Sequence, residues 1–259
     1  MTTRQMLPLY EGKMGHAFDH RFGTFVGIED TDIQPNHDHS TESSVLPRYW
    51  VRPESADERQ KRRTWGTDLA MLGFRRVARN TDERTCIAAI LPWGAASYGW
   101  ILSAGPSVQE LAFLCAQYNS FIFDFVLRQF LSQPSIPQGT FEQLPTIPPN
   151  HARTVPFGAS TAFDWIVHRS VEISATDKVL APYAEASGES GAPFVWDEDR
   201  RELLRAELDA AFLHLFEIPR DDAGYVLDSF DLVLRRDFAK HGEYRTKRLI
   251  LDAYDQLAG

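Results

Sequence analysis

Residues 74–92 read FRRVARNTDERTCIAAILP, a polar, arginine-rich half followed by an apolar half. Residues 86–91 are apolar, include β-branched side chains and end at Pro92, which predicts a short buried strand. The three residues Asn80-Thr81-Asp82 before this strand are typical of a turn. The stretch therefore predicts a tight polar loop that a rigid strand holds in place.

The charge of this loop allows two interpretations. Guanidinium groups suit phosphate oxygens and guanine edges, and an asparagine suits adenine, so the loop could contact nucleic acid. Alternatively, the arginines are solvated or paired with the neighbouring Asp82 and Glu83. The residues that carry the first interpretation are Arg75, Arg76, Arg79, Asn80, Thr81 and Arg84.

The stretch resembles the segment FR-x-x-A-R-x-T-x-E-R-T-x-I-A-A-x-x-P in the C-terminal part of type IIG-like restriction-modification methylases. These are large adenine-N6 DNA methyltransferases, and they include the methylases of the BREX and DISARM phage-defence systems. Other segments resemble the same family in the same order: PLYEGKM (8–14), FDHR (18–21), NSF (119–121) with Asp124 and Arg128, QLP (143–145), WD (196–197) through LDA (208–210), and YRTKR (244–248).

The resemblance implies a DNA-binding specificity module that works with a catalytic methyltransferase domain or subunit. We expect double-stranded DNA as its ligand and, in a defence complex, a helicase or nuclease as a further partner. S-adenosylmethionine is expected in the catalytic partner and not in this chain. To the six loop residues the resemblance adds Lys13 and Arg128 as candidates for DNA contact.

Hydrophobic periodicity predicts an α/β (α+β) domain over residues 1–149, followed by a mainly α-helical domain over residues 150–259. The resemblance implies that the first of these is the target-recognition domain. In the first domain, short strands are expected at 18–24, 47–51 and 97–102, with a charged surface helix at 54–64. Apolar residues recur every three or four positions from 107 to 131, which predicts one long amphipathic helix. Five prolines then exclude regular structure from 132–149.

The second half reads as a series of helices. Apolar periodicity predicts them at 161–174, 197–216, 221–229 and 243–257, and Asp197 is suited to cap the second. Tyr244, Arg245, Lys247 and Arg248 would lie in the first turns of the last helix, where cations oppose the helix dipole and an external anion could offset the cost.

Composition limits the class of protein. With 43% hydrophobic residues and 12% aromatic residues the chain is globular. A net charge of −9 argues against a general polyanion binder, although residues 48–84 hold ten lysines and arginines against six acidic residues. No signal peptide and no apolar stretch of membrane-spanning length occur, and Cys86 and Cys115 lie in apolar runs, so we expect a cytoplasmic protein without a membrane partner.

Motifs of several enzyme classes are missing from the sequence. It has neither the glycine-rich cofactor turn nor the Asn/Asp-Pro-Pro-Tyr/Phe loop of an amino-methyltransferase, and no phosphate loop or Gly-x-Ser-x-Gly elbow. No metal site is expected at His16 and His20, because the residues between them lack the glutamate of a zincin helix. None is expected at His37 and His39 either, because no paired cysteine or further histidine completes a site. We therefore expect no catalytic residue in this chain.

Two other functions remain open at this point. The acidic, helical half could dock a helicase, a nuclease or a methylase, which would make the chain a structural or interaction subunit. A hydrolase with a site built from histidine and aspartate residues dispersed in sequence is the third possibility.

Overall fold

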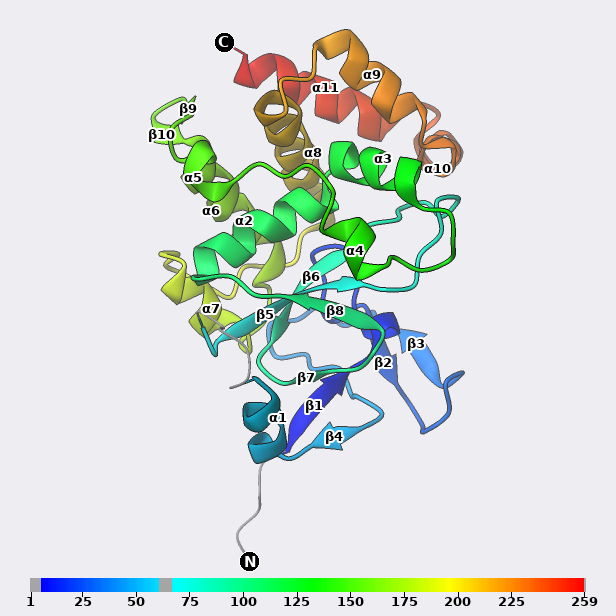
Figure 1. Cartoon of the computed structure of the whole chain (residues 1–259), viewed down its shortest axis with the longest axis vertical. Helices are drawn as coiled ribbons and strands as arrows, with labels where there is room; N and C mark the ends of the chain where they lie inside the picture. Colours follow the sequence, from blue (N-terminus) through cyan, green and yellow to red (C-terminus); the bar gives the residue numbers. More distant parts are fainter. Residues whose placement is uncertain (1–5, 61–66, 259) are drawn as a thin grey trace, which may run out of the picture. The chain divides into compact units, whose positions relative to one another are not determined.

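The computed structural model describes residues 6–60 and 67–258. The fold is mixed α+β, with small sheets and many helices, which confirms the expected class (Figure 1). The chain forms two compact units, and each draws on segments from both sides of residue 149. The first unit contains residues 1–77, 87–115 and 171–196, and the second contains residues 78–86, 116–170 and 197–259.

The first unit is built around an antiparallel three-stranded sheet. Its central strand β5 (Ala70–Arg75) pairs with β6 (Ala88–Pro92) on one side and with β8 (Trp100–Ser103) on the other (Figure 1). The strand expected at 86–91 is thereby confirmed. All five residues of β6 are buried, as its apolar sequence requires.

A second small sheet of this unit has β1 (Leu7–Tyr10) between β4 (Trp50–Val51) and β7 (Ala95–Ala96). A hairpin of β2 (Gly23–Phe25) and β3 (Ile33–Pro35) and the short helices α1 (Pro53–Gln60) and α7 (Ala181–Ala186) complete the unit. Of the helix expected at 54–64, residues 61–64 lie outside the described part of the chain.

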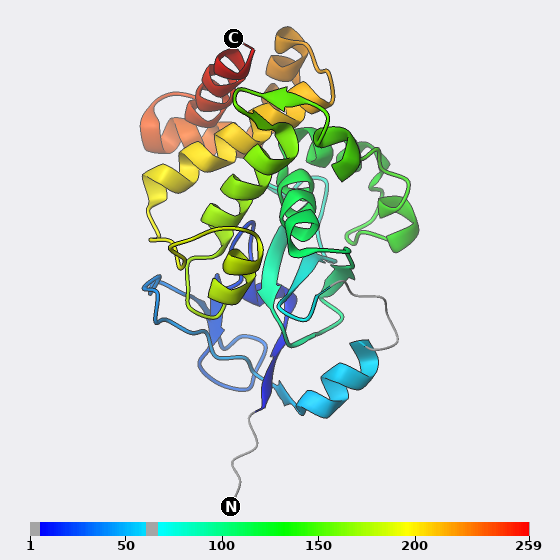
Figure 2. The ribbon, with the colours of Figure 1, turned by 90° about the vertical axis from the view of Figure 1, so that its left-hand side faces the viewer.

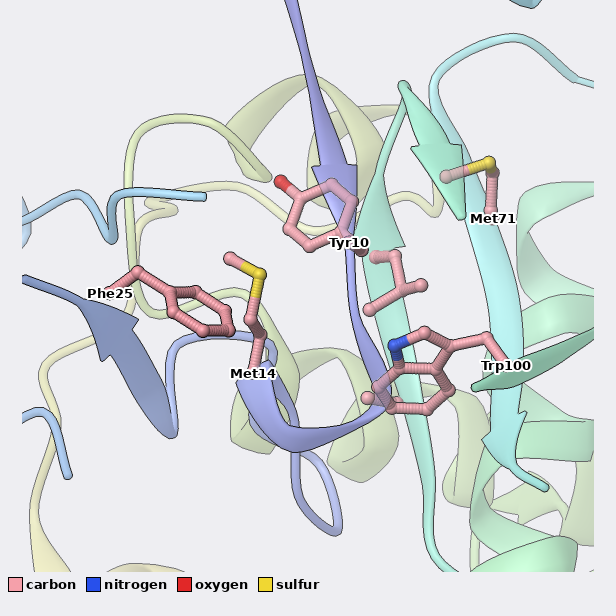
Figure 3. Close-up of a cluster of buried hydrophobic side chains, with 7 residues drawn as sticks. Tyr10, Met14, Phe25, Met71 and Trp100 are labelled. Atoms are coloured by element: carbon pink, nitrogen blue, oxygen red, sulfur yellow. The ribbon is translucent and has the colours of Figure 1, made fainter. Parts of the chain in front are cut away.

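Side chains from several of these strands meet in one apolar cluster (Figure 3). Tyr10, Met14, Phe25, Met71 and Trp100 pack together, with Ala89 and Leu91 beside them. Met14 comes from the 3-10 turn Gly12–Met14, so burying its side chain fixes the position of that turn on the sheet. This anchors the segment that carries Lys13.

The second unit is mainly helical. Its long helix α8 (Glu198–Leu215) packs along α11 (Arg245–Leu257), which also contacts α9 (Arg220–Asp228) and α10 (Asp231–His241) (Figure 2). Asp197 caps α8 as expected, accepting a hydrogen bond from the Arg200 N–H at 2.8 Å. The remaining elements are the short helix α5 (Pro149–Ala152) and the hairpin of β9 (Pro156–Phe157) and β10 (Ser160–Thr161). The expected helix at 161–174 is α6 (Ala162–Ser174).

Three expectations were wrong in detail. The helix expected at 107–131 is two helices, α2 (Val108–Asn119) and α3 (Phe121–Phe130). The break lies at Ser120, which has extended backbone angles and caps α3 by accepting a hydrogen bond from the Phe123 N–H at 3.3 Å. A short helix α4 (Gln138–Phe141) forms within the proline-rich stretch, because Pro137 precedes it where no N–H donor is needed. Residues 18–22 form a turn and not a strand, since Phe18 has φ 58°.

Among the described residues, no helix combines the length and the apolar character needed to cross a bilayer.

Candidate nucleic-acid interface

Two of the candidate arginines lie at the end of strand β5: Arg75 is its last residue and Arg76 follows it. Its interior residues are buried, and the backbone N–H of Arg75 donates to the Ile87 carbonyl at 2.8 Å. The N–H of Arg76 donates to the Gly99 carbonyl at 2.9 Å, and its guanidinium lies 4.0 Å above the ring of Tyr98. Both arginines are half-buried, and the Tyr98 side chain is 76% exposed. The strand therefore holds a cation and an exposed aromatic ring together.

Lys13 lies on a turn that packs against the Tyr98 turn. The backbones of Gly12 and Gly99 approach so closely that a Cβ on Gly99 would stand 2.8 Å from the Gly12 nitrogen. Lys13 is exposed, and its ammonium lies 3.9 Å from the Asp30 carboxylate, a weak surface pair. In the first unit Gly99 thus contacts the turn that carries Lys13 and accepts a hydrogen bond from Arg76, a connection that the sequence did not reveal.

The second unit contains the loop with the remaining candidates, residues 79–83. The N–H of Arg79 donates to the Asp82 carboxylate at 2.9 Å, and the N–H of Asp82 donates to the Arg79 carbonyl at 3.1 Å, which confirms the expected turn. The Asn80 amide donates to the Leu131 carbonyl at 3.2 Å. The side chains of Arg79 and Thr81 point outward and are exposed.

Arg84 faces inward from this loop. Its Nε donates to the Asp124 carboxylate at 2.8 Å, its Nη2 donates to the Asn119 carbonyl, and its guanidinium lies 4.0 Å from the Phe121 ring centroid. Burial alone would lower the pKa of Arg84, but the carboxylates of Asp124 and Asp209 raise it. The guanidinium is therefore fixed in its charged form beside α3.

Arg128 binds the same carboxylate from the other side. Its Nε donates to Asp124 at 3.0 Å, and its Nη2 donates to the Asp82 and Glu83 carbonyls at 2.8 and 2.9 Å. Asp124 is fully buried and also accepts from the Thr85 N–H at 3.0 Å. Two arginines, one carboxylate and the loop backbone thus form one network, here called the Asp124 network. It fastens residues 79–83 to α3.

This geometry divides the sequence-predicted residues by role. Arg84 and Arg128 are engaged inside the protein, and Asn80 is tied to the backbone of Leu131, whereas Arg79 and Thr81 face outward. DNA contact by any of them stays a prediction.

A buried carboxyl group at the start of α3 was not expected from the sequence as part of the site. Asp209 projects from α8 and accepts a hydrogen bond from the Phe121 N–H at 2.6 Å. Burial raises the pKa of Asp209 to about 7, although Arg84 and the Phe121 N–H favour its charged form. The sequence signals were an aspartate among the apolar residues of a helix and its place in the LDA segment (208–210) of the resemblance, and neither pointed to α3.

The first unit has a separate buried polar cluster. His20 Nε2 lies 2.8 Å from the Asp177 carboxylate, and the guanidinium of Arg21 donates to the Ser40 and Thr176 carbonyls. Burial would raise the pKa of Asp177, but the hydrogen bond and charge of His20 and the charge of Arg21 lower it. The cluster joins segments distant in sequence. Its side chains are almost fully enclosed, which suits a structural role.

Within the described ranges, no group of three or more histidine, cysteine, aspartate or glutamate side chains is placed to hold a metal ion. Comparisons of the chain with protein-family models, with curated proteins and with solved structures found no match. The methyltransferase resemblance therefore rests on the sequence segments alone.

Proposed function

We propose that this chain is the DNA-binding specificity module of an adenine-N6 methyltransferase of a restriction-modification or phage-defence system. Its ligand is double-stranded DNA, and its main partner is a catalytic subunit or domain that binds S-adenosylmethionine and transfers the methyl group. A helicase or nuclease of the same system is a further partner. In this proposal side chains of residues 1–149 read the DNA in the cytoplasm, and residues 150–259 contribute supporting helices to both compact units.

The observation that carries the proposal is the way the loop at residues 79–83 is held. The Asp124 network fastens its backbone at several points, yet Arg79 and Thr81 remain exposed at its tip. Fixing the loop before binding reduces the entropy lost when the loop contacts a ligand. An exposed guanidinium on such a loop suits a phosphate or a guanine edge.

A second group of cations supports the same function. Arg75 ends strand β5, Arg76 follows it and donates to the Gly99 carbonyl, and Gly99 lies against the turn that carries Lys13. Positive charge on rigid backbone is the arrangement that phosphate contacts require. In this account Arg84 and Arg128 position the loop, Arg75, Arg76 and Arg79 contact DNA, and Lys13 is a further candidate for contact.

The test is a salt titration of binding, measured by fluorescence anisotropy with a labelled random duplex between about 50 and 200 mM salt. Wild type is compared with the double variant Arg75→Ala/Arg79→Ala. The control is Arg235→Ala/Lys240→Ala, which removes the same charge from exposed positions of α10. If both arginines contact phosphates, the slope of log K against log salt becomes shallower by about 1.8 in the first variant and stays unchanged in the control. Equal slopes in all three proteins would contradict the assignment.

A structural or interaction subunit is the second candidate, because the helices of the second unit expose apolar side chains. Tyr225, Leu232 and Phe238 are all exposed on α9 and α10. Such side chains suit a protein partner, although scattered exposed apolar residues are also common on monomers. A folded protein that binds no DNA at low salt and co-purifies with a methylase, helicase or nuclease would favour this candidate.

A further inference from the structure

The ring of Tyr98 is open to solvent although its backbone is firmly held. The Ser97 N–H donates to the Tyr10 carbonyl at 2.8 Å, and the Trp100 N–H donates to the Ser97 carbonyl at 3.1 Å. The close approach of Gly12 and Gly99 leaves no room for either turn to shift toward the other. The Tyr98 side chain is 76% exposed, so most of its ring is open to a ligand. Here the backbone holds it outward.

The guanidinium of Arg76 covers one face of this ring at 4.0 Å. Among the described residues, no carboxylate forms an ion pair with Arg76, so none of them neutralises its charge. A cation stacked on an aromatic ring keeps its N–H donors at the edge of the stack, where they can reach an anion. The pair therefore offers an aromatic surface and a phosphate-binding group side by side.

We propose that Tyr98 and Arg76 bind one unstacked nucleotide of DNA, with its base against the Tyr98 ring and its phosphate on Arg76. The inference rests on the proposed DNA-binding function and adds a mode of recognition to it. Base stacking on an exposed aromatic side chain tolerates any base, because every base has a π face. The site therefore favours single-stranded or locally opened DNA.

The chemistry of the pair favours a nucleotide over an apolar protein segment. A protein partner would bury the Arg76 charge at a desolvation cost unless it supplied a carboxylate. A nucleotide supplies a planar ring and a phosphate at neighbouring positions.

The test uses a thymidine oligonucleotide of about 12 residues with a central 2-aminopurine, whose fluorescence is quenched by stacking. The full chain is titrated as wild type, Tyr98→Ala, Tyr98→Phe and Arg76→Ala. The matched control is Tyr225→Ala, because Tyr225 is 71% exposed and its ring meets that of Phe125 in a T-shaped contact at 6.4 Å. No guanidinium of the described residues lies over the Tyr225 ring. The same proteins are titrated with a fully paired duplex.

Wild type is expected to quench 2-aminopurine. Tyr98→Ala should lose the quenching and bind about 5- to 150-fold more weakly, the range for one stacked base, with its salt slope unchanged. Tyr98→Phe and Tyr225→Ala should match wild type, and Arg76→Ala should reduce the slope by about 0.7.

Two results would overturn the stacking site but leave the DNA-binding function standing. One is equal oligonucleotide binding by Tyr98→Ala and wild type, and the other is binding to the duplex with none to the oligonucleotide. Failure of folded wild type to bind either DNA would overturn both proposals.

Discussion

The substitution Asp124→Asn tests the network that holds the candidate loop. Asparagine has nearly the volume of aspartate and keeps one acceptor oxygen, so the change removes charge without leaving a cavity. The carboxylate it replaces is fully buried and accepts from Arg84 Nε at 2.8 Å, from Arg128 Nε at 3.0 Å and from the Thr85 N–H at 3.0 Å. Removing the anion of a buried ion pair costs about 3–5 kcal/mol, because the cations left behind are poorly solvated.

Such a loss is a large part of the stability of a typical protein, about 5–15 kcal/mol in total. Urea unfolding followed by circular dichroism measures it as a lower midpoint at an unchanged slope. The control is Asp231→Asn, because Asp231 is 76% exposed and its ion pair with Arg235 spans 4.0 Å. That change should cost less than about 0.5 kcal/mol. A loss below about 1 kcal/mol for Asp124→Asn would refute the claim that this carboxylate holds both arginines.

Three further substitutions test other parts of the account. The pKa of Asp209 is about 7 in the folded protein, against an ordinary value near 3.8, so the folded protein retains a proton that the unfolded chain releases. The free energy of unfolding should therefore fall as pH rises from about 4 to 7, by up to about 4 kcal/mol. Asp209→Asn should remove this dependence, as measured by urea unfolding at several pH values. Ser120→Ala should lower stability by about 1 kcal/mol in the same assay, because α3 loses its cap. Gly99→Ala should lower the midpoint of thermal unfolding, because the new Cβ would stand 2.8 Å from the Gly12 nitrogen. The control Gly139→Ala should not lower it, because the Cβ at that position would meet nothing within 4 Å.

Each of these substitutions has a result that would count against it. An unchanged pH profile in Asp209→Asn would mean that another group titrates. A neutral Ser120→Ala would show that α3 does not depend on its cap, and equal midpoints for the two glycine variants would show that the Gly12–Gly99 contact is not tight.

Local sequence patterns predicted the elements whose stability is local. The strand expected at 86–91 formed as β6 (Ala88–Pro92), and Asp197 capped the expected helix, because apolar periodicity and capping chemistry act within a few residues. Ser120 shows the limit. Apolar periodicity continues across it, while the serine itself is compatible with either a helix interior or a cap.

Partners distant in sequence could not be read from spacing. Arg84 and Asp124 lie 40 positions apart, and Asp209 and Phe121 lie 88 apart. Whether an arginine faces solvent or a buried carboxylate depends on such distant contacts. The sequence therefore grouped Arg84 with Arg79, whereas in the structure Arg79 is exposed and Arg84 pairs with the buried Asp124. The sequence predicted the eight candidates from the chemistry of their side chains. Only the three-dimensional structure separates the exposed side chains from those that are paired inside the protein.

The measurement that tests the central claim most directly is the affinity of the folded wild-type chain for a random DNA duplex as salt is raised from about 50 to 200 mM. The account predicts measurable binding at the lower salt and a log K that falls linearly with log salt, the mark of counterion release by phosphate contacts. Absence of binding at the lower salt, by a protein whose circular dichroism shows it to be folded, would contradict the claim that this chain binds DNA by itself.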